Sequence, residues 1–127
     1  MTTRKLTLWR VFTLIYLCIV AYLCFATPNM LPKVSNWHFA IPADKIVHFC
    51  MFAPLPVLLF MCSADKANKT LAKISACLII GVLTAGITEI IQGFSPYRSM
   101  ELSDFLSDCL GMVLSCLLLM IFRKKTF

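Results

Sequence analysis

The stretch TEIIQGFSPYRSMELSDFLSDCLG, residues 88–111, separates two long apolar runs in the C-terminal half of the chain. It concentrates charged and polar side chains in a sequence that otherwise has few of them. These side chains are Glu89, Gln92, Arg98, Glu101, Asp104 and Asp108. The apolar runs on either side predict two helices that cross a membrane, so the stretch marks the point where both helices reach the same membrane face.

The composition of the whole chain agrees with this interpretation. Of its 127 residues, 60% are hydrophobic and 14% are charged, and the mean hydropathy is +0.85, whereas about a quarter of a soluble domain is charged. Four segments have the length of about 20 residues that a bilayer core requires. They lie at roughly 7–26, 44–62, 70–92 and 102–122. The sequence therefore predicts an all-α membrane protein, with residues 1–127 forming one domain, a four-helix antiparallel transmembrane bundle.

Basic residues predict the orientation of this bundle, because they gather on the cytoplasmic side of membrane proteins. If the spans alternate in direction, nine of the twelve basic residues fall on one side. The nine are Arg4, Lys5, Arg10, Lys66, Lys69, Lys73, Arg123, Lys124 and Lys125. Both termini are then cytoplasmic, and the loops 27–43 and 93–101 lie outside. This distribution and contact with anionic lipid account for the net charge of +6, without a nucleic-acid partner.

In this topology five of the six acidic residues collect at the outer face, near the ends of three spans. The polar group expected there as a ligand-binding site comprises Asp44, Lys45, His48, Glu89, Gln92, Arg98, Asp104 and Asp108. Glu89 is the most demanding member, since it lies near a helix C-terminus, where the helix dipole opposes a negative charge. We expect it to pair with Lys45 or Arg98, with His48 completing the network. The alternative is that these groups only hold the bundle together by hydrogen bonds between helices.

Helical spacing also predicts how the spans pack. Each of the last two spans carries a stripe with small residues in its middle and polar residues at its outer end. The stripes are Gly81, Ala85, Glu89 and Gln92 on the third span, and Asp104, Asp108, Gly111 and Ser115 on the fourth. Small residues allow membrane helices to approach closely, so we expect the two stripes to face each other. Pro54 and Pro56 predict a bend in the second span.

Four motifs in order resemble the VanZ-like membrane proteins. The pattern of that family, DK-x-x-H, E-x-x-Q, R and D-x-x-x-N-x-x-G, corresponds to IPADKIVHF, TEIIQ, an Arg six residues after the Gln, and DFLSDCLG. The matching residues are Asp44, Lys45, His48, Glu89, Gln92, Arg98, Asp104 and Gly111, while Asp108 stands where the family has Asn. The resemblance implies a small bacterial protein of the inner (cytoplasmic) membrane, linked through its namesake to low-level resistance to teicoplanin-type lipoglycopeptides.

Three functions fit these residues. In the first, the outer polar pocket binds or helps to modify an envelope amphiphile, such as a membrane lipid, a lipid-linked envelope precursor or a lipoglycopeptide. Lys45 and Arg98 would then contact phosphate or carboxylate oxygens. In the second, the protein is a membrane enzyme that acts on a lipid or prenyl-phosphate headgroup. The third, a proton- or ion-coupled transporter, ranks last, because four spans are few unless the chain forms oligomers.

The enzyme hypothesis names its own residues. His48 would be the general base, oriented by Asp44 or Glu89, since an imidazole titrates near neutral pH. The candidates for catalysis are His48, Glu89 and Asp104. The candidates for binding a divalent cation are Asp104, Asp108 and His48, because hard cations prefer oxygen ligands. The sequence contains no motif that identifies a nucleophile.

Overall fold

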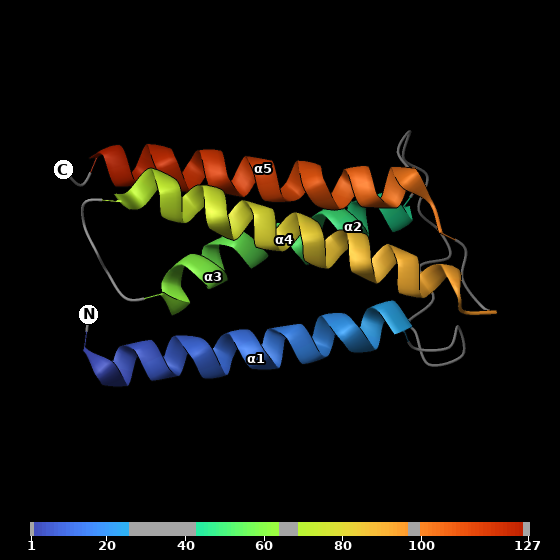
Figure 1. Ribbon diagram of the computed structural model, residues 1–127, viewed down its shortest axis with the longest axis horizontal. Helices are drawn as coiled ribbons and strands as arrows, with labels where there is room; N and C mark the ends of the chain where they lie inside the picture. The colour runs from blue at the N-terminus through green and yellow to red at the C-terminus, as the bar shows by residue number, and fades with distance from the viewer. Residues whose placement is uncertain (1, 26–42, 64–68, 97–99, 126–127) are drawn as a thin grey trace.

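The structure, a computed structural model, describes residues 2–25, 43–63, 69–96 and 100–125, without the side chains of residues 43, 44, 124 and 125. These segments are helical, and they contain no strand (Figure 1). The helices are α1 (Thr3–Phe25), α2 (Ala43–Phe52), α3 (Leu55–Cys62), α4 (Thr70–Gly93) and α5 (Leu102–Lys125). The all-helical class predicted from the sequence is thus confirmed for the described part of the chain.

Among the described residues, four helical segments are long and apolar enough to cross a membrane, as predicted. They are Thr3–Phe25, Lys45–Cys62, Thr70–Gly93 and Leu102–Arg123, and the second of them joins α2 and α3. The first span begins at Thr3, four residues before the expected start, because the helix continues through the basic residues at its end. Long basic side chains at a helix end can reach the membrane surface while their stems stay along apolar surface.

The long helices lie side by side, and the start of α1 and the end of α5 are at the same end of the molecule (Figure 1). Many large apolar side chains point away from the other helices. Leu14 is 63% exposed and Ile79 is 60% exposed, for example, and each lies in the middle of a span. Contiguous apolar surface of this kind is unfavourable in water and favourable against lipid. The outward faces of the helices are therefore suited to a bilayer.

The second span is broken near its middle, which confirms the predicted bend. The helix α2 ends at Phe52, and α3 begins at Leu55 with Pro54 as its N-cap. Proline has no backbone N–H, so Pro54 and Pro56 cannot continue the hydrogen-bond ladder of α2. Pro56 is tolerated in the first turn of α3, where its missing N–H would have no helical partner.

The helix α1 attaches to this broken span through polar contacts. The hydroxyl group of Tyr16 donates a hydrogen bond to the carbonyl of Met51, close to the break. Near the other end of α3, Arg10 Nε donates to the Cys62 carbonyl at 3.3 Å, and Thr13 Oγ1 lies 3.0 Å from Cys62 Sγ. Backbone carbonyls at the break and at the end of α3 thus receive partners from a neighbouring helix, as the membrane interior requires.

Glycines allow α5 to pack closely against its neighbours. The expectation that the small-residue stripes of the third and fourth spans face each other is only partly met. A Cβ atom at Gly111 would lie 2.6 Å from the carbonyl oxygen of Phe49 and 3.3 Å from Ala53 Cβ, so Gly111 faces α2. The stripe pattern had predicted that Gly111 would face α4, and this prediction is wrong. On α4, a Cβ atom at Gly81 would lie 2.6 Å from Met112 Sδ of α5. The two stripes therefore meet only in part, because α5 packs against both α2 and α4, and Gly111 lies on the side toward α2.

Candidate functional site

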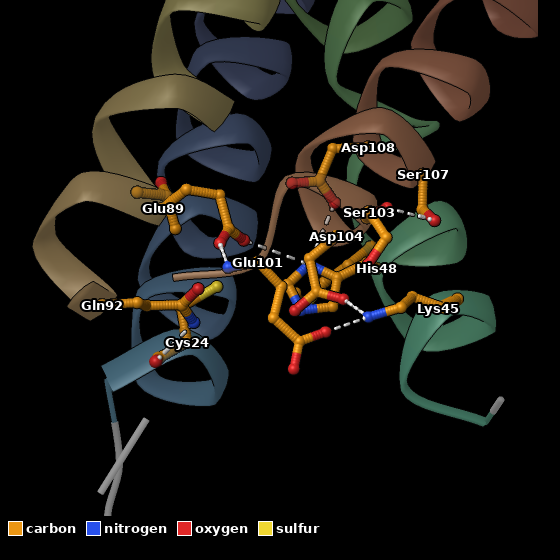
Figure 2. A network of polar contacts seen from close by, with 12 residues as sticks. Cys24, Lys45, His48, Glu89, Gln92, Glu101, Ser103, Asp104, Ser107 and Asp108 are labelled. Carbon is orange, nitrogen blue, oxygen red and sulfur yellow. Dashed lines mark hydrogen bonds and ion pairs between the residues drawn. The ribbon is translucent and has the colours of Figure 1, made fainter. Parts of the chain in front are cut away.

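Four polar side chains from three helices gather at one end of the molecule. They are His48 of α2, Glu89 of α4, and Asp104 and Asp108 of α5, and all four are buried. Figure 2 shows these side chains pointing toward one another. The exposed fraction of Glu89 is 3% and that of Asp108 is 0%, although both lie within apolar spans. The acidic residues that the sequence separates by up to 19 positions (Glu89 and Asp108) thus share one buried cluster.

His48 is the centre of this cluster. Its Nδ1 atom lies 3.0 Å from Asp108 Oδ1, which is a hydrogen-bond distance, and 3.9 Å from Glu89 Oε1. Its Nε2 atom lies 3.6 Å from Asp104 Oδ2. A carboxylate accepts hydrogen bonds and does not donate them, so with Asp108 ionised the imidazole carries a hydrogen on Nδ1. Asp108 therefore places a carboxylate within hydrogen-bond distance of the histidine.

Lys45 forms the edge of the cluster. It precedes His48 by three residues on α2, and residues at this spacing share one face of a helix. Its ammonium group forms ion pairs with Asp104 and with Glu101, the latter at 2.5 Å (Figure 2). Asp104 thus lies between Lys45 and His48. Its place in the first turn of α5 also suits a carboxylate, because the helix dipole is positive there.

The polar contacts of Glu89 are weaker than those of Asp104 and Asp108. Its Oε2 atom accepts a long hydrogen bond of 3.5 Å from the backbone N–H of Glu101. Its Oε1 atom is buried and has no hydrogen-bond partner among the residues that the structure describes, and the same is true of Asp108 Oδ2. Of the partners expected for Glu89, His48 lies within ion-pair distance, Lys45 pairs with Asp104 and Glu101, and Arg98 is outside the described residues.

Two further residues of the expected ligand-binding group lie elsewhere or cannot be placed. Gln92 is buried, but its Nε2 atom donates a hydrogen bond of 2.8 Å to the carbonyl of Cys24, near the end of α1. It therefore connects α4 to α1, and its amide nitrogen is not part of the carboxylate cluster. Asp44 belongs to the first turn of α2, and its side chain lies outside the described residues.

Glu101 belongs to the site, although it was not among the residues expected in the ligand-binding group. Its side chain pairs with Lys45, and its backbone N–H donates to Glu89, so it connects α2 and α4 just before α5 begins. The sequence contains a signal for this role. Glu101 precedes Asp104 by three residues, and the two carboxylates therefore lie on the same side of the start of the helix.

The cluster has the donor atoms of a cation site. His48, Glu89 and Asp104 each offer one atom, and these three atoms all lie within 4.8 Å of one another. This set differs from the expected metal ligands in one member, since Glu89 stands where Asp108 was expected. The four described carboxylates of the site also outnumber its described basic groups, which are Lys45 and His48. Excess negative charge in a buried site favours a cation or protons.

The described residues combine four helices that are long and apolar enough to cross a membrane with a buried cluster of one histidine and several carboxylates. This combination is that of a multi-pass membrane protein with an ionisable site at one end of its helices. The chain belongs to the VanZ/LLP1 family, whose model matches residues 11–123. This match confirms the family resemblance that the motifs had indicated. It extends beyond them into the first span, which the motifs do not include.

A search of known proteins finds a similar chain in fission yeast, Schizosaccharomyces pombe, where the protein is called uncharacterized. The two are 31% identical over 112 residues, which are 88% of this chain and 62% of the yeast protein. This chain thus spans less than two thirds of that relative. The expected restriction to bacteria is not confirmed, since this relative is eukaryotic. No solved structure matches the chain.

Proposed function

We propose that this protein binds the polar headgroup of a membrane amphiphile at the cluster around His48. In the proposed arrangement, residues 1–127 form one domain in a cytoplasmic membrane, the four spans alternate in direction, and both termini are cytoplasmic. The cluster then lies at the outer face, where the headgroups of the outer leaflet are. Lipids, lipid-linked envelope precursors and teicoplanin-type lipoglycopeptides all have a polar head on an apolar tail, so resistance to the last of these is one expected consequence.

One observation carries this proposal: three helices bring buried ionisable side chains to the same place, and two of their oxygens have no hydrogen-bond partner within the described part of the chain. Leaving a buried acceptor unsatisfied costs about 1–3 kcal/mol. A cluster that served only to hold the helices together would be expected to satisfy its own oxygens. Ionisable groups within membrane spans are functional-site candidates for the same energetic reason.

Lipid identification on the purified protein tests the proposal. We would purify the full chain, the His48→Gln variant and the Ser107→Ala variant in mild detergent, and identify the bound lipids by native mass spectrometry. Ser107 is a matched control, because it lies on α5 near the cluster and its exposed hydroxyl bonds only within the helix, to the Ser103 carbonyl. We expect the wild type and Ser107→Ala to retain one class of lipid that His48→Gln loses. Identical lipid profiles in all three would contradict headgroup binding at this site.

Hydrolysis of a lipid phosphate is the second candidate, and the hydrogen bond between His48 and Asp108 favours it. An imidazole oriented by a carboxylate is a common general base. His48 would take a proton from a water molecule, whose oxygen attacks the phosphorus, and return the proton to the leaving oxygen. Release of inorganic phosphate from a polyprenyl diphosphate in nanodiscs measures this activity. A rate equal in the wild type and in His48→Gln would exclude this mechanism.

A further inference from the structure

We propose that His48, Glu89 and Asp104 bind one divalent cation of the zinc or manganese type, and that Asp108 positions His48 for this role. The inference deepens the proposed function, because it explains how a site rich in carboxylates binds an anionic headgroup. The proposal that a cation binds is argued from the positions of the donor atoms. The proposal that this cation contacts a phosphate of the headgroup rests on the proposed function.

The distances between the donor atoms suit a single ion. Nitrogen and oxygen ligands of zinc lie about 2.0–2.2 Å from the metal, so two ligands of one ion are at most about 4.4 Å apart. The three donor atoms of His48, Glu89 and Asp104 lie within 4.8 Å of one another. Small side-chain rotations would bring them to coordinating distance. The three residues come from three different helices, so an ion here would also connect α2, α4 and α5.

A second observation is independent of this spacing. The side chain of Glu89 is only 4% exposed, and no described residue forms a hydrogen bond with its Oε1 atom. Figure 2 shows that the Glu89 carboxylate points from α4 into the cluster. A buried carboxylate oxygen without a hydrogen-bond donor, directed at a histidine and a second carboxylate, is the arrangement that a metal ligand would have before its ion binds.

Asp108 supplies the support that a metal-binding histidine needs. Histidines that bind metals usually donate their other ring N–H to a carboxylate or a carbonyl, which fixes the ring and its tautomer. Asp108 Oδ1 lies 3.0 Å from Nδ1 of His48, so Nε2, which lies 3.6 Å from Asp104 Oδ2, is the nitrogen available to an ion. Glu89 Oε1 lies 3.9 Å from Nδ1, so Glu89 would have to rotate toward Asp104 to share an ion with Nε2. Asp108 is fully buried and belongs to the same helix as Asp104.

The choice of ion follows from the donor set. Carboxylate oxygens bind hard cations such as Mg²⁺ and Ca²⁺, whereas an imidazole nitrogen favours zinc and other transition metals. A site with one imidazole and two carboxylates therefore prefers Zn²⁺ or Mn²⁺ over Mg²⁺ or Ca²⁺. The positive charge of the ion also offsets the excess of carboxylates over Lys45 and His48 among the described groups. An open coordination position would accept a phosphate oxygen from a headgroup.

Metal binding by the full chain in detergent tests the inference. The protein is treated with a chelator, exchanged into metal-free buffer, and titrated with Zn²⁺, Mn²⁺, Mg²⁺ and Ca²⁺, with bound metal measured by mass spectrometry after gel filtration. We expect one equivalent of Zn²⁺ or Mn²⁺ in the wild type. Glu89→Gln should weaken this binding on the order of 100-fold or more, and Asp108→Asn about 10–100-fold, as for supporting residues of known metal sites.

Ser107→Ala is the matched control. Ser107 lies on α5 near the cluster, but its exposed hydroxyl bonds to the Ser103 carbonyl of the same helix, so metal affinity should stay that of the wild type. The inference is overturned if the wild type binds no Zn²⁺ or Mn²⁺, if Glu89→Gln binds as well as the wild type, or if Ser107→Ala loses as much affinity as Glu89→Gln.

Two additional readouts keep the test decisive. Pulsed electron paramagnetic resonance on the wild type loaded with Mn²⁺ needs no variant, and it should detect coupling to a histidine nitrogen. Bound Mn²⁺ without this coupling overturns the assignment even if a variant fails to fold. Lipid retention is measured on the same samples. Lipid retained equally with and without metal would refute the bridging role of the ion, but not headgroup binding. Metal binding without lipid retention would refute headgroup binding, but not the metal site.

Discussion

At the scale of single residues, the structure separates side chains that the sequence grouped together. Glu89 and Gln92 lie one turn apart on the buried face of α4, and both were expected in the ligand-binding group. Glu89 is directed at His48, whereas Gln92 is hydrogen-bonded to the carbonyl of Cys24 on α1. Although they lie on adjacent turns of α4, the long side chains of Glu89 and Gln92 contact different helices, α2 and α1. Their spacing predicts the face that they share, but not the groups that they contact.

Gln92 should therefore matter for stability and not for ligand binding. Gln92→Ala removes a buried hydrogen bond of 2.8 Å and leaves the Cys24 carbonyl with one donor fewer, so the free energy of unfolding should fall by about 1–2 kcal/mol. Ser107→Ala, whose hydroxyl is exposed, should change it by less than about 0.5 kcal/mol. Unfolding in mixed micelles measures both values. Loss of bound metal or lipid in a folded Gln92→Ala protein would show that this residue belongs to the site after all.

At the scale of the helices, the position of α5 against both α2 and α4 determines which residues are in contact. Hydropathy predicted the four spans, and the prolines predicted the break between α2 and α3, since both are properties of the local sequence. The partner of Gly111 was not predictable in the same way. A small residue indicates that some helix approaches closely, but which one depends on the arrangement of all the helices. The same limit explains why Glu101 was overlooked: its contacts with Lys45 and Glu89 join two other helices.

Gly111→Ala tests the close approach of α5 to α2. The new Cβ atom would lie 2.6 Å from the Phe49 carbonyl oxygen, which is backbone and cannot rotate away. We expect a loss of about 1–3 kcal/mol, typical of an overpacked core, together with weaker metal binding, because α2 carries His48. Gly86→Ala is the control. Its Cβ atom would meet only the Phe105 ring at 3.6 Å, an ordinary contact, so stability should be unchanged or rise by up to about 1 kcal/mol. Equal stability of the two variants would contradict the tight α2–α5 contact.

At the scale of the whole molecule, basic and acidic side chains gather at opposite ends. The start of α1 and the end of α5 lie at one end (Figure 1), and Arg4, Lys5 and Arg123 belong to these segments. The carboxylate cluster lies at the other end, where α4 finishes and α5 begins. Positively charged segments remain on the cytoplasmic side of membrane proteins, so this division predicts the orientation that was inferred from the sequence.

Reporter fusions test this orientation. A reporter that is active only outside the cytoplasm should be inactive when fused after Phe127 and active when inserted within residues 27–43. A reporter that is active only in the cytoplasm provides the reciprocal control at both positions. A C-terminal fusion that is active outside the cytoplasm would place the cluster at the inner face. The headgroup would then have to come from the inner leaflet, and contact with an external lipoglycopeptide would be excluded.

The stability of Glu89→Gln, measured without metal or added lipid, tests most directly whether the buried cluster is a binding site or a structural support. The amide keeps the shape of the side chain and can still accept the hydrogen bond from the Glu101 N–H, while it removes one charge from a site with excess carboxylates. We expect a free energy of unfolding within about 1 kcal/mol of the wild type, or above it. In the separate metal titration, the same variant should have lost metal binding. A loss of about 3–5 kcal/mol, which is the cost of breaking a buried ion pair, would show instead that Glu89 holds the bundle together, and it would contradict the binding site.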